Sequence, residues 1–262
     1  MRVSIAAAGM AALISLAGIT TAAQAGKIVV NNDEWTFTDL AFSWASPDTA
    51  KFAENIANYF AGGTGGNFLV YSNNQAFTGS SLASTVSGAG HNWTVDTAIP
   101  FTLSALSVYD GIFITAFPHA ADTSVMIDYV NNGGSIYLAG GTGYLGATGE
   151  AAVWNPFLNA FGLTFDGAAD YNMVSGIFPV EAGFFLTKGV DDLFYSNGLT
   201  VKKTGTLQYP YTQIFGYANG FGALAIYDSE GIPEAGGLAL LGAGLIGLGI
   251  SAQRQRRRHL TA

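Results

Sequence analysis

The sequence predicts an α/β fold, in which a doubly wound, mostly parallel sheet is followed by a β-rich C-terminal third. Short apolar runs alternate with segments of helical period between residues 46 and 161, a rhythm typical of such sheets. One run, DGIFITAF at Asp110–Phe117, is apolar throughout, as in strands buried on both faces. From Leu163 the chain changes to short, turn-rich segments of β character, and a hydrophobic helix is expected at the C-terminus.

The first half of this pattern starts with a helix. Ser46-Pro47-Asp48 supplies a capping residue and a first-turn proline, apolar residues follow at helical spacing, and Gly62-Gly63 ends the helix. The elements expected next are a strand at Asn67–Tyr71, a weaker helix near Ser80–Val86 and a strand at His91–Val95.

The second half repeats strand and helix. After the apolar strand we expect a helix at about Asp122–Asn131, a strand at Ser135–Ala139 and a helix at about Gly149–Phe161. The last helix carries four large apolar residues, Trp154, Phe157, Leu158 and Phe161.

Residues 1–25 have the features of a signal peptide. Arg2 precedes a continuous stretch of apolar and small residues, and Ala23-Gln24-Ala25 fits the A-x-A cleavage pattern. The fold is therefore expected to start close to Lys27, in an exported protein.

Residues 232–258 form a tail of three parts: Pro233-Glu234, an uncharged run at Ala235–Ala252, and a cluster of arginines. The cluster contains Arg254, Arg256, Arg257 and Arg258. A helix of eighteen residues spans roughly 27 Å, close to the ~30 Å of a hydrocarbon layer. The arginines would keep its end on the cytoplasmic side.

This tail resembles the PEP-CTERM sorting signal, in which a Pro-Glu-Pro motif, a helix rich in glycine and leucine and an arginine cluster close the protein. The second proline of the motif is Ala235 in this chain. The resemblance implies processing near Pro233-Glu234 by the membrane protease-transpeptidase exosortase, transient attachment to the inner membrane, and a Gram-negative producer of exopolysaccharide. A permanent tail anchor is the alternative.

Between the two signals, residues 26–231 are enough for one domain. They contain five lysines, seventeen acidic residues and no arginine, a net charge of −12. Nucleic acid and highly phosphorylated ligands are therefore not expected as partners, because neutralising phosphates requires clustered positive charge. The absence of cysteine excludes disulfides, thiolate metal sites and a cysteine nucleophile.

From Trp35 to Asp228 the chain resembles class I glutamine amidotransferase-like, or flavodoxin-like, domains. The segments that carry the resemblance are YDGIFIT, IDYVNNGGSIYLAGGTG, LNAFGLTF, LTKGVDDLFYSNG and GFGALAIYDS, in that order. The family's catalytic cysteine occupies a tight turn between a strand and a helix, which corresponds here to Gly140–Tyr144, with Thr142 or a neighbour in its place. No histidine lies between residues 120 and 258. The resemblance thus implies a domain without amidotransferase activity, and no cofactor is expected.

Candidate site residues gather at the carboxyl edge of the predicted sheet, where open α/β sheets place their sites. His119 follows one strand and Thr142 another, and Glu150 lies near the start of the next helix. A hydrolytic arrangement of these three is conceivable, although an exposed loop histidine and an ordinary turn explain them as well. Ligand contacts are also expected at this edge, from Asn73, Asn74, Gly141, Thr142 and Gly143.

The stretch LAGGTGYLG also carries the G-x-G-x-x-G spacing of dinucleotide-binding loops, with Asp166 twenty residues beyond its last glycine. We do not expect a dinucleotide, because the motif follows a late strand and no arginine is available for phosphate. The acidic loops Asp166–Asp170 and Asp191-Asp192 lack the ligand order of a calcium site, and we expect no metal. The segment TLQYPYTQIFGYANGF could stack on sugar rings, but burial in a β-rich core is favoured.

The sequence thus predicts an exported, exosortase-processed protein of the cell envelope or extracellular matrix. Its domain would act in binding or structure, in connection with exopolysaccharide. The alternative of a different class is a secreted hydrolase that uses Thr142, His119 and Glu150.

Overall fold

The computed structural model describes residues 26–115, 121–168, 171, 175–181, 183–205 and 211–233. The predicted signal peptide, the sorting tail from Glu234 onward with its arginines, and His119 lie outside these residues. Within the described part of the chain, no helix is both long and apolar enough to cross a membrane.

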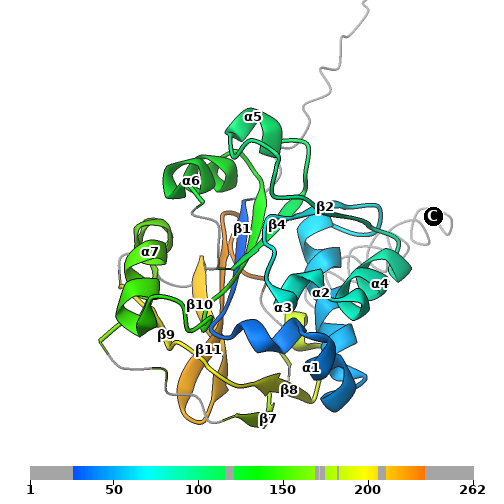
Figure 1. Cartoon of the computed structure of the whole chain (residues 1–262), viewed down its shortest axis with the longest axis vertical. Coiled ribbons are helices and arrows are strands. Elements are labelled where there is room, and N and C mark those ends of the chain that lie inside the picture. The colour runs from blue at the N-terminus through cyan, green and yellow to red at the C-terminus, as the bar shows by residue number, and fades with distance from the viewer. Residues whose placement is uncertain are drawn as a thin grey trace, which may run out of the picture.

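A mostly parallel, seven-stranded sheet forms the centre of the domain (Figure 1). Its strand order is β10-β11-β1-β5-β4-β2-β3. Five neighbouring strands are parallel, and β11 and β10 extend the sheet antiparallel beside β1. In chain order the strands are β1 (Lys27–Asn31), β2 (Asn67–Val70), β3 (Asn92–Val95), β4 (Gly111–Thr115), β5 (Ser135–Ala139), β10 (Thr212–Ala218) and β11 (Phe221–Asp228).

Helices cover both faces of this sheet (Figure 1). One face packs against helices from the first part of the chain: η1 (Glu34–Phe37), α1 (Asp39–Trp44), α2 (Asp48–Ala61), α3 (Gln75–Thr78) and α4 (Ser80–Gly88). The other face packs against α5 (Leu103–Leu106), α6 (Thr123–Asn131) and α7 (Gly146–Ala160). The helices change face after β3, where the strand order reverses, as right-handed crossovers require. The carboxyl ends of the parallel strands therefore share one open edge.

The predicted helices form near their predicted positions, and the short helices α1, α3 and α5 were not predicted. The predicted cap of α2 is wrong, because its N-cap is Pro47 and no side chain caps it. In α2 the residues Phe52, Ile56 and Phe60 make a fully buried stripe at helical spacing, and Gly62 ends the helix in the left-handed region at φ 68°. The predicted helix at Gly149–Phe161 begins earlier, at Gly146, because Leu145 adopts φ 64° and starts the first turn. Trp154 is completely buried there, as its apolar stripe predicts.

The strands bury side chains on both faces, as predicted for the apolar runs. All five residues of β4 and of β5 are buried. On one face Phe113 stacks on Tyr137, with ring centroids 5.2 Å apart, and on the other Ile112 and Ile136 join the second core. Two layers of core around one sheet give the chain its doubly covered architecture.

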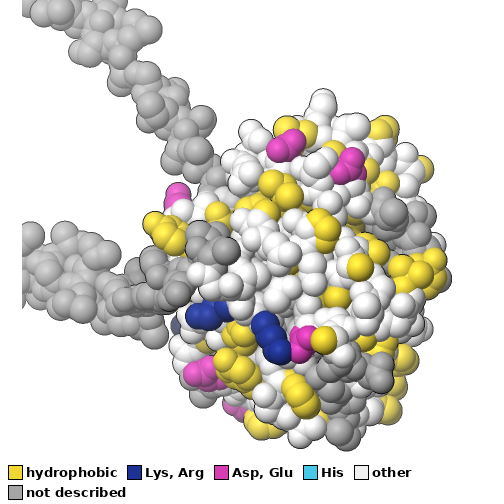
Figure 2. Space-filling view, turned by 90° about the vertical axis from the view of Figure 1, so that its left-hand side faces the viewer, with side chains coloured by type: hydrophobic (Ala, Val, Ile, Leu, Met, Phe, Trp, Pro, Cys, Tyr) yellow, Lys and Arg dark blue, Asp and Glu magenta, His cyan; other side chains and the backbone are white. Residues whose placement is uncertain are grey.

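The C-terminal third is rich in strands, as expected. Besides the β10–β11 hairpin, whose turn at Asn219-Gly220 has positive φ at both residues, it contains two small antiparallel pairs. These pair β6 (Leu163–Phe165) with β9 (Val201–Lys203) and β7 (Gly176–Pro179) with β8 (Asp192–Tyr195), and a short helix η2 (Phe185–Thr187) lies between β7 and β8. The low content of charged residues appears at the surface, where neutral and scattered apolar groups cover most of the face in Figure 2.

The two ends of the described domain meet at the amino edge of the sheet. Lys27 of β1 pairs with Asp228 of β11, and the Ser229 amide donates to the Gly26 carbonyl at 3.0 Å. Tyr59 closes this junction, because its hydroxyl donates to Asp228 Oδ2 at 2.5 Å and its carbonyl accepts from Lys27 Nζ at 2.6 Å. Strand β1 was not predicted, yet it lies between the parallel and antiparallel parts of the sheet.

Candidate functional site

Three loops at the carboxyl edge of the sheet enclose an open cavity of about 500 Å³. They follow β1, β2 and β5, of which β1 and β5 are paired in the sheet. The cavity is lined by Glu34, Asn73, Asn74, Gln75, Thr142, Gly143 and Tyr144. Among these seven residues Glu34 carries the only carboxyl group, and none is basic.

Asp33 anchors the first loop. Its carboxylate accepts hydrogen bonds from the backbone amides of Trp35 at 2.8 Å, Ser196 at 2.5 Å and Asn197 at 2.6 Å. Burial raises the pKa of Asp33 to about 6, and these three amides oppose that rise. Asp33 thus ties the end of β1 to the loop after β8 and leaves the next residue, Glu34, to face the cavity.

Glu34 is an acid that is held almost without solvent. Only 7% of the residue is exposed, and its Oε2 accepts a short hydrogen bond from Asn74 Nδ2. Burial raises the pKa of Glu34 to about 7, with smaller contributions from the neighbouring charges of Asp33 and Glu150 and an opposing one from Asn74. Glu34 therefore changes its charge near neutral pH and can donate a hydrogen bond below it.

The side-chain amide of Asn74 lies at the cavity, and hydrogen bonds hold both its oxygen and its nitrogen. Its Oδ1 caps α3 by accepting from the Ala76 amide at 2.8 Å, which leaves Nδ2 directed at Glu34. The preceding backbone is held by Ser72, whose Oγ accepts from the Asn74 amide at 3.1 Å. Ser72 in turn bonds Thr115 at the end of β4, at 3.0 Å.

The third loop passes so close to its neighbours that it requires glycine. Gly141 has φ 74°, and a Cβ there would lie 2.3 Å from the carbonyl oxygen of Asn197 and 2.8 Å from that of Asn32. Asn197 also holds this loop, because its Nδ2 donates to the Gly141 carbonyl at 3.1 Å. The glycines of the motif thus serve a tight turn between β5 and α7.

Glu150 supports the third loop from below. It is fully buried in α7, and its Oε1 accepts from the Thr142 amide at 3.2 Å while its Oε2 accepts from the Tyr171 hydroxyl at 2.6 Å. Burial raises the pKa of Glu150, and the Tyr171 and Thr142 donors oppose the rise. The Glu150 carboxyl group therefore already accepts the hydrogen bond of the Thr142 amide. A phosphate or an oxyanion at this turn would need that amide as its donor.

Thr142, within the dinucleotide-like spacing, and Asp166, beyond it, both have partners within the domain. The Thr142 amide faces Glu150, and Asp166 forms a surface ion pair with Lys202 at 2.5 Å. That pair holds the pKa of Asp166 below its usual range.

The structure brings most of the predicted edge residues together. Asn73, Asn74, Thr142 and Gly143 line the cavity, while Gly141 and Glu150 are buried and are not among the lining residues. His119 lies outside the described residues, so its predicted neighbourhood with Thr142 stays a prediction. His91, expected to be structural, is buried, and its Nδ1 accepts from the Gly66 amide at 3.0 Å.

The acid pair Asp33-Glu34 was missed by sequence reasoning. The signal was present, since the apolar run KIVV directly follows the predicted cleavage site and is itself followed by NNDE. An apolar strand that ends in amides and acids has the form of a site edge in a parallel sheet. This strand and the acid pair precede Trp35, where the resemblance to amidotransferase-like domains begins.

Two other sequence expectations concern metals and tyrosines. Across the described residues, no group of three or more His, Asp or Glu side chains could hold a metal ion. Core burial proved wrong for two tyrosines of the C-terminal segment: Tyr211 and Tyr217 are about half exposed, while Phe215 is buried. Strand β10 turns Phe215 inward and leaves Tyr217 on its outer side.

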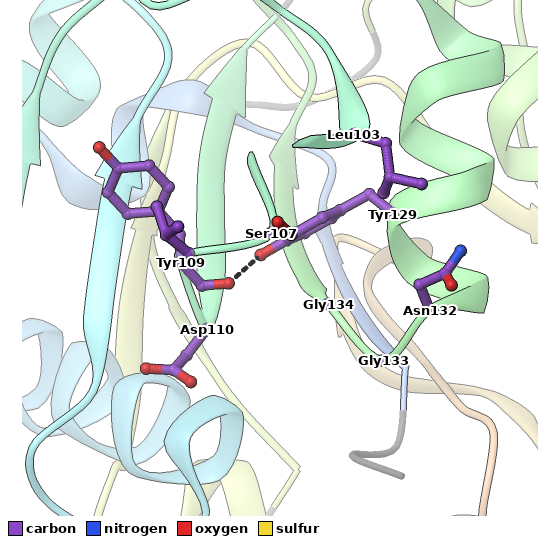
Figure 3. Close-up of a pocket in the computed structure, with 9 residues that line it drawn as sticks. Leu103, Ser107, Tyr109, Asp110, Tyr129, Asn132, Gly133 and Gly134 are labelled. Atoms are coloured by element: carbon purple, nitrogen blue, oxygen red, sulfur yellow. Dashed lines mark hydrogen bonds between the residues drawn. The ribbon is translucent and has the colours of Figure 1, made fainter. Parts of the chain in front are cut away.

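A smaller cavity of about 120 Å³ lies at the opposite end of the sheet (Figure 3). Its labelled residues belong to α5, to α6 and to the connections from these helices to β4 and β5. The Tyr129 hydroxyl donates to the Tyr109 carbonyl at 2.7 Å, and Asp110 accepts from the Asn67 amide at 2.7 Å. These polar groups hydrogen-bond to one another. We therefore attribute this cavity to the packing of side chains at the amino edge of the sheet.

Comparison of the chain with protein-family models, with curated proteins and with solved structures gives no match to any of them.

Proposed function

We propose that this chain is an exported protein of the cell envelope or extracellular matrix whose carboxyl-edge cavity binds a neutral, hydroxyl-rich ligand, such as a sugar unit of an exopolysaccharide. The observation that carries the proposal is the lining of the cavity. Side-chain amides of Asn73, Asn74 and Gln75 and the protonatable Glu34 supply donors and acceptors, and Tyr144, 45% exposed, adds an aromatic face. The absence of basic lining residues argues against anionic ligands.

Binding without cleavage is favoured over hydrolysis. The Thr142 amide already donates to Glu150 Oε1, so it is not a free donor for a tetrahedral oxyanion at this turn. The Thr142 hydroxyl accepts from the Tyr144 amide at 3.3 Å. A hydrolase in which His119 activates Thr142 remains the alternative proposal, and it requires turnover of a substrate at this edge.

Export and sorting belong to the same proposal. The signal peptide at residues 1–25 and the tail at 232–258 support export, transient attachment to the inner membrane and processing by exosortase, as the PEP-CTERM resemblance implies. The mostly parallel sheet with a tight glycine turn after β5 supports kinship with amidotransferase-like domains that lack the catalytic cysteine.

The binding proposal is tested with the full chain, purified in detergent and titrated with a panel of neutral oligosaccharides in a calorimeter. Asn73→Ala removes an exposed amide from the cavity and should weaken binding about fivefold to twentyfold, the value of one or two hydrogen bonds. Asn92→Ala removes an exposed amide from β3, remote from the lining residues, and should leave binding unchanged. Equal affinities of wild type and Asn73→Ala would count against the cavity as the binding site.

The sorting proposal is tested by mass spectrometry of the C-terminus of the protein recovered from its host. A terminus near Pro233-Glu234 is expected. An intact RQRRRHLTA end in the surface protein would favour a permanent tail anchor.

A further inference from the structure

A second cavity of about 320 Å³ adjoins the first along the carboxyl edge. Both cavities are lined by Gln75, and the consecutive residues Glu34 and Trp35 of η1 line one cavity each. The second cavity is lined by Trp35, Thr38, Asp39, Leu40, Gln75, Thr78 and Gly79. One exposed, flexible side chain is therefore shared by the two cavities.

The walls of the second cavity are built in advance by local hydrogen bonds. Thr38 Oγ1 donates to the Trp35 carbonyl at 2.9 Å, and Thr78 Oγ1 donates to the Asn74 carbonyl at 3.1 Å. Asp39 Oδ1 accepts from the Ser81 amide at 2.9 Å. Because these groups are held by α1, α3 and α4, little order has to be gained when a ligand enters.

The lining of the two cavities together is suited to an elongated, uncharged ligand. None of the residues that line either cavity is basic, and hydroxyl, amide and carboxyl groups alternate with apolar surface. Partly exposed apolar side chains lie in each cavity, Tyr144 in the first and Leu40, 38% exposed, in the second. Each cavity falls within the size range of small-molecule sites, so each has room for a ligand unit of its own.

We infer that the two cavities are adjacent subsites of one groove that binds consecutive units of a linear, neutral polysaccharide chain. The inference rests on the proposed function and adds to it the polymeric nature of the ligand. Gln75 lies between the units, where its amide can bond both of them. An extended peptide fits less well, because peptides are commonly bound by adding a strand to a free sheet edge, and this groove lies across strand ends.

The test compares chain lengths, using the full chain in detergent and neutral sugars of glucose, galactose or mannose from the monosaccharide to the linear hexamer. The dimer and longer chains should bind about tenfold or more tightly than the monosaccharide, because the second subsite is then filled by a tethered unit. Leu40→Ala should weaken binding of the dimer and longer chains about threefold to tenfold and leave monosaccharide binding unchanged. Val108→Ala removes a more exposed aliphatic side chain, 66% against 38% for Leu40, outside the groove and should change neither affinity.

The outcomes separate the two proposals. Affinity that is independent of length, or equal effects of Leu40→Ala and Val108→Ala, would overturn the two-subsite groove while the single binding site stands. Failure of every oligosaccharide to bind would overturn both. Binding of a neutral Ser- and Asn-rich peptide in place of the sugars would identify the groove as a peptide site and likewise overturn both.

Discussion

Glu34→Gln should stabilise the domain at alkaline pH and leave its stability unchanged at acid pH. The substitution keeps the size of the side chain and an oxygen that can accept from Asn74 Nδ2, and it removes the charge. In the folded protein the pKa of Glu34 rises from 4.5 to about 7, whereas the unfolded chain releases the proton near 4.5. The wild type therefore loses stability as the pH rises from about 4.5 to about 7, and Glu34→Gln lacks this loss.

The size of the effect follows from the pKa. A rise from 4.5 to about 7 corresponds to at most about 3 kcal/mol in the free energy of unfolding above pH 7. We expect Glu34→Gln to exceed the wild type by about 2–3 kcal/mol at pH 8.5, which raises the melting temperature by roughly 5–10 °C in a domain of this size.

The assay is urea unfolding of the full chain in detergent, at pH 4 and pH 8.5, followed by tryptophan fluorescence. Glu54→Gln serves as the control, because Glu54 is partly exposed in α2 and only forms a surface pair with Lys51. That variant should change stability by less than about 1 kcal/mol at either pH. A Glu34→Gln variant no more stable than the wild type at pH 8.5 would refute the claim that Glu34 is a destabilised, buried acid.

Four further substitutions test the loops of the site and the contact of α2 with the start of β8. Gly141→Ala should destabilise the domain by about 2–4 kcal/mol, because the new Cβ meets backbone oxygens. Gly143→Ala has the same φ but only an ordinary contact, to Asn197 Nδ2 at 3.5 Å, and should cost about 1 kcal/mol. Similar losses for the two variants in thermal unfolding would contradict the close approach at Gly141. Tyr171→Phe should cost about 1–3 kcal/mol, because Oε2 of the buried Glu150 loses its hydroxyl donor, and an unchanged midpoint in urea unfolding would show that this bond adds no stability. Asp48→Ala should cost about 1–2 kcal/mol in the same assay, since Asp48 Oδ2 accepts from two amides at the start of β8, and an unchanged midpoint would show that these bonds add nothing.

The sheet and its helices could be predicted because local pattern and tertiary role agree in them. The apolar run of β4 and the stripe of α2 can be buried in few other ways, and the glycines after α2 and β5 mark turns whose φ is positive. The start of α7 differed from the prediction because it depends on Leu145 in the left-handed region, which propensity does not favour.

The position of the site could be predicted from the sequence, but the contacts of its residues could not. The edge rule placed Asn74 and Thr142 together, since both follow parallel strands. It could not show that Glu150 would turn back to the Thr142 amide, because that contact depends on how α7 packs. The role of Glu34 depends on burial by a loop forty residues away, and burial of that kind has no period in the sequence.

The pairing of Lys27 with Asp228 has a consequence for how the domain is presented. Because the chain enters and leaves the domain at the amino edge, a tether on either end holds the molecule by one pole, and the groove points away from the point of attachment. A domain attached to a membrane in this way would expose the carboxyl edge of its sheet to the surroundings. This holds whether the attachment is a leader, a tail anchor or a linkage made after processing. The length of the tether would then set the distance and the orientation of the domain relative to the membrane. The domain could bind a polymer without rotating.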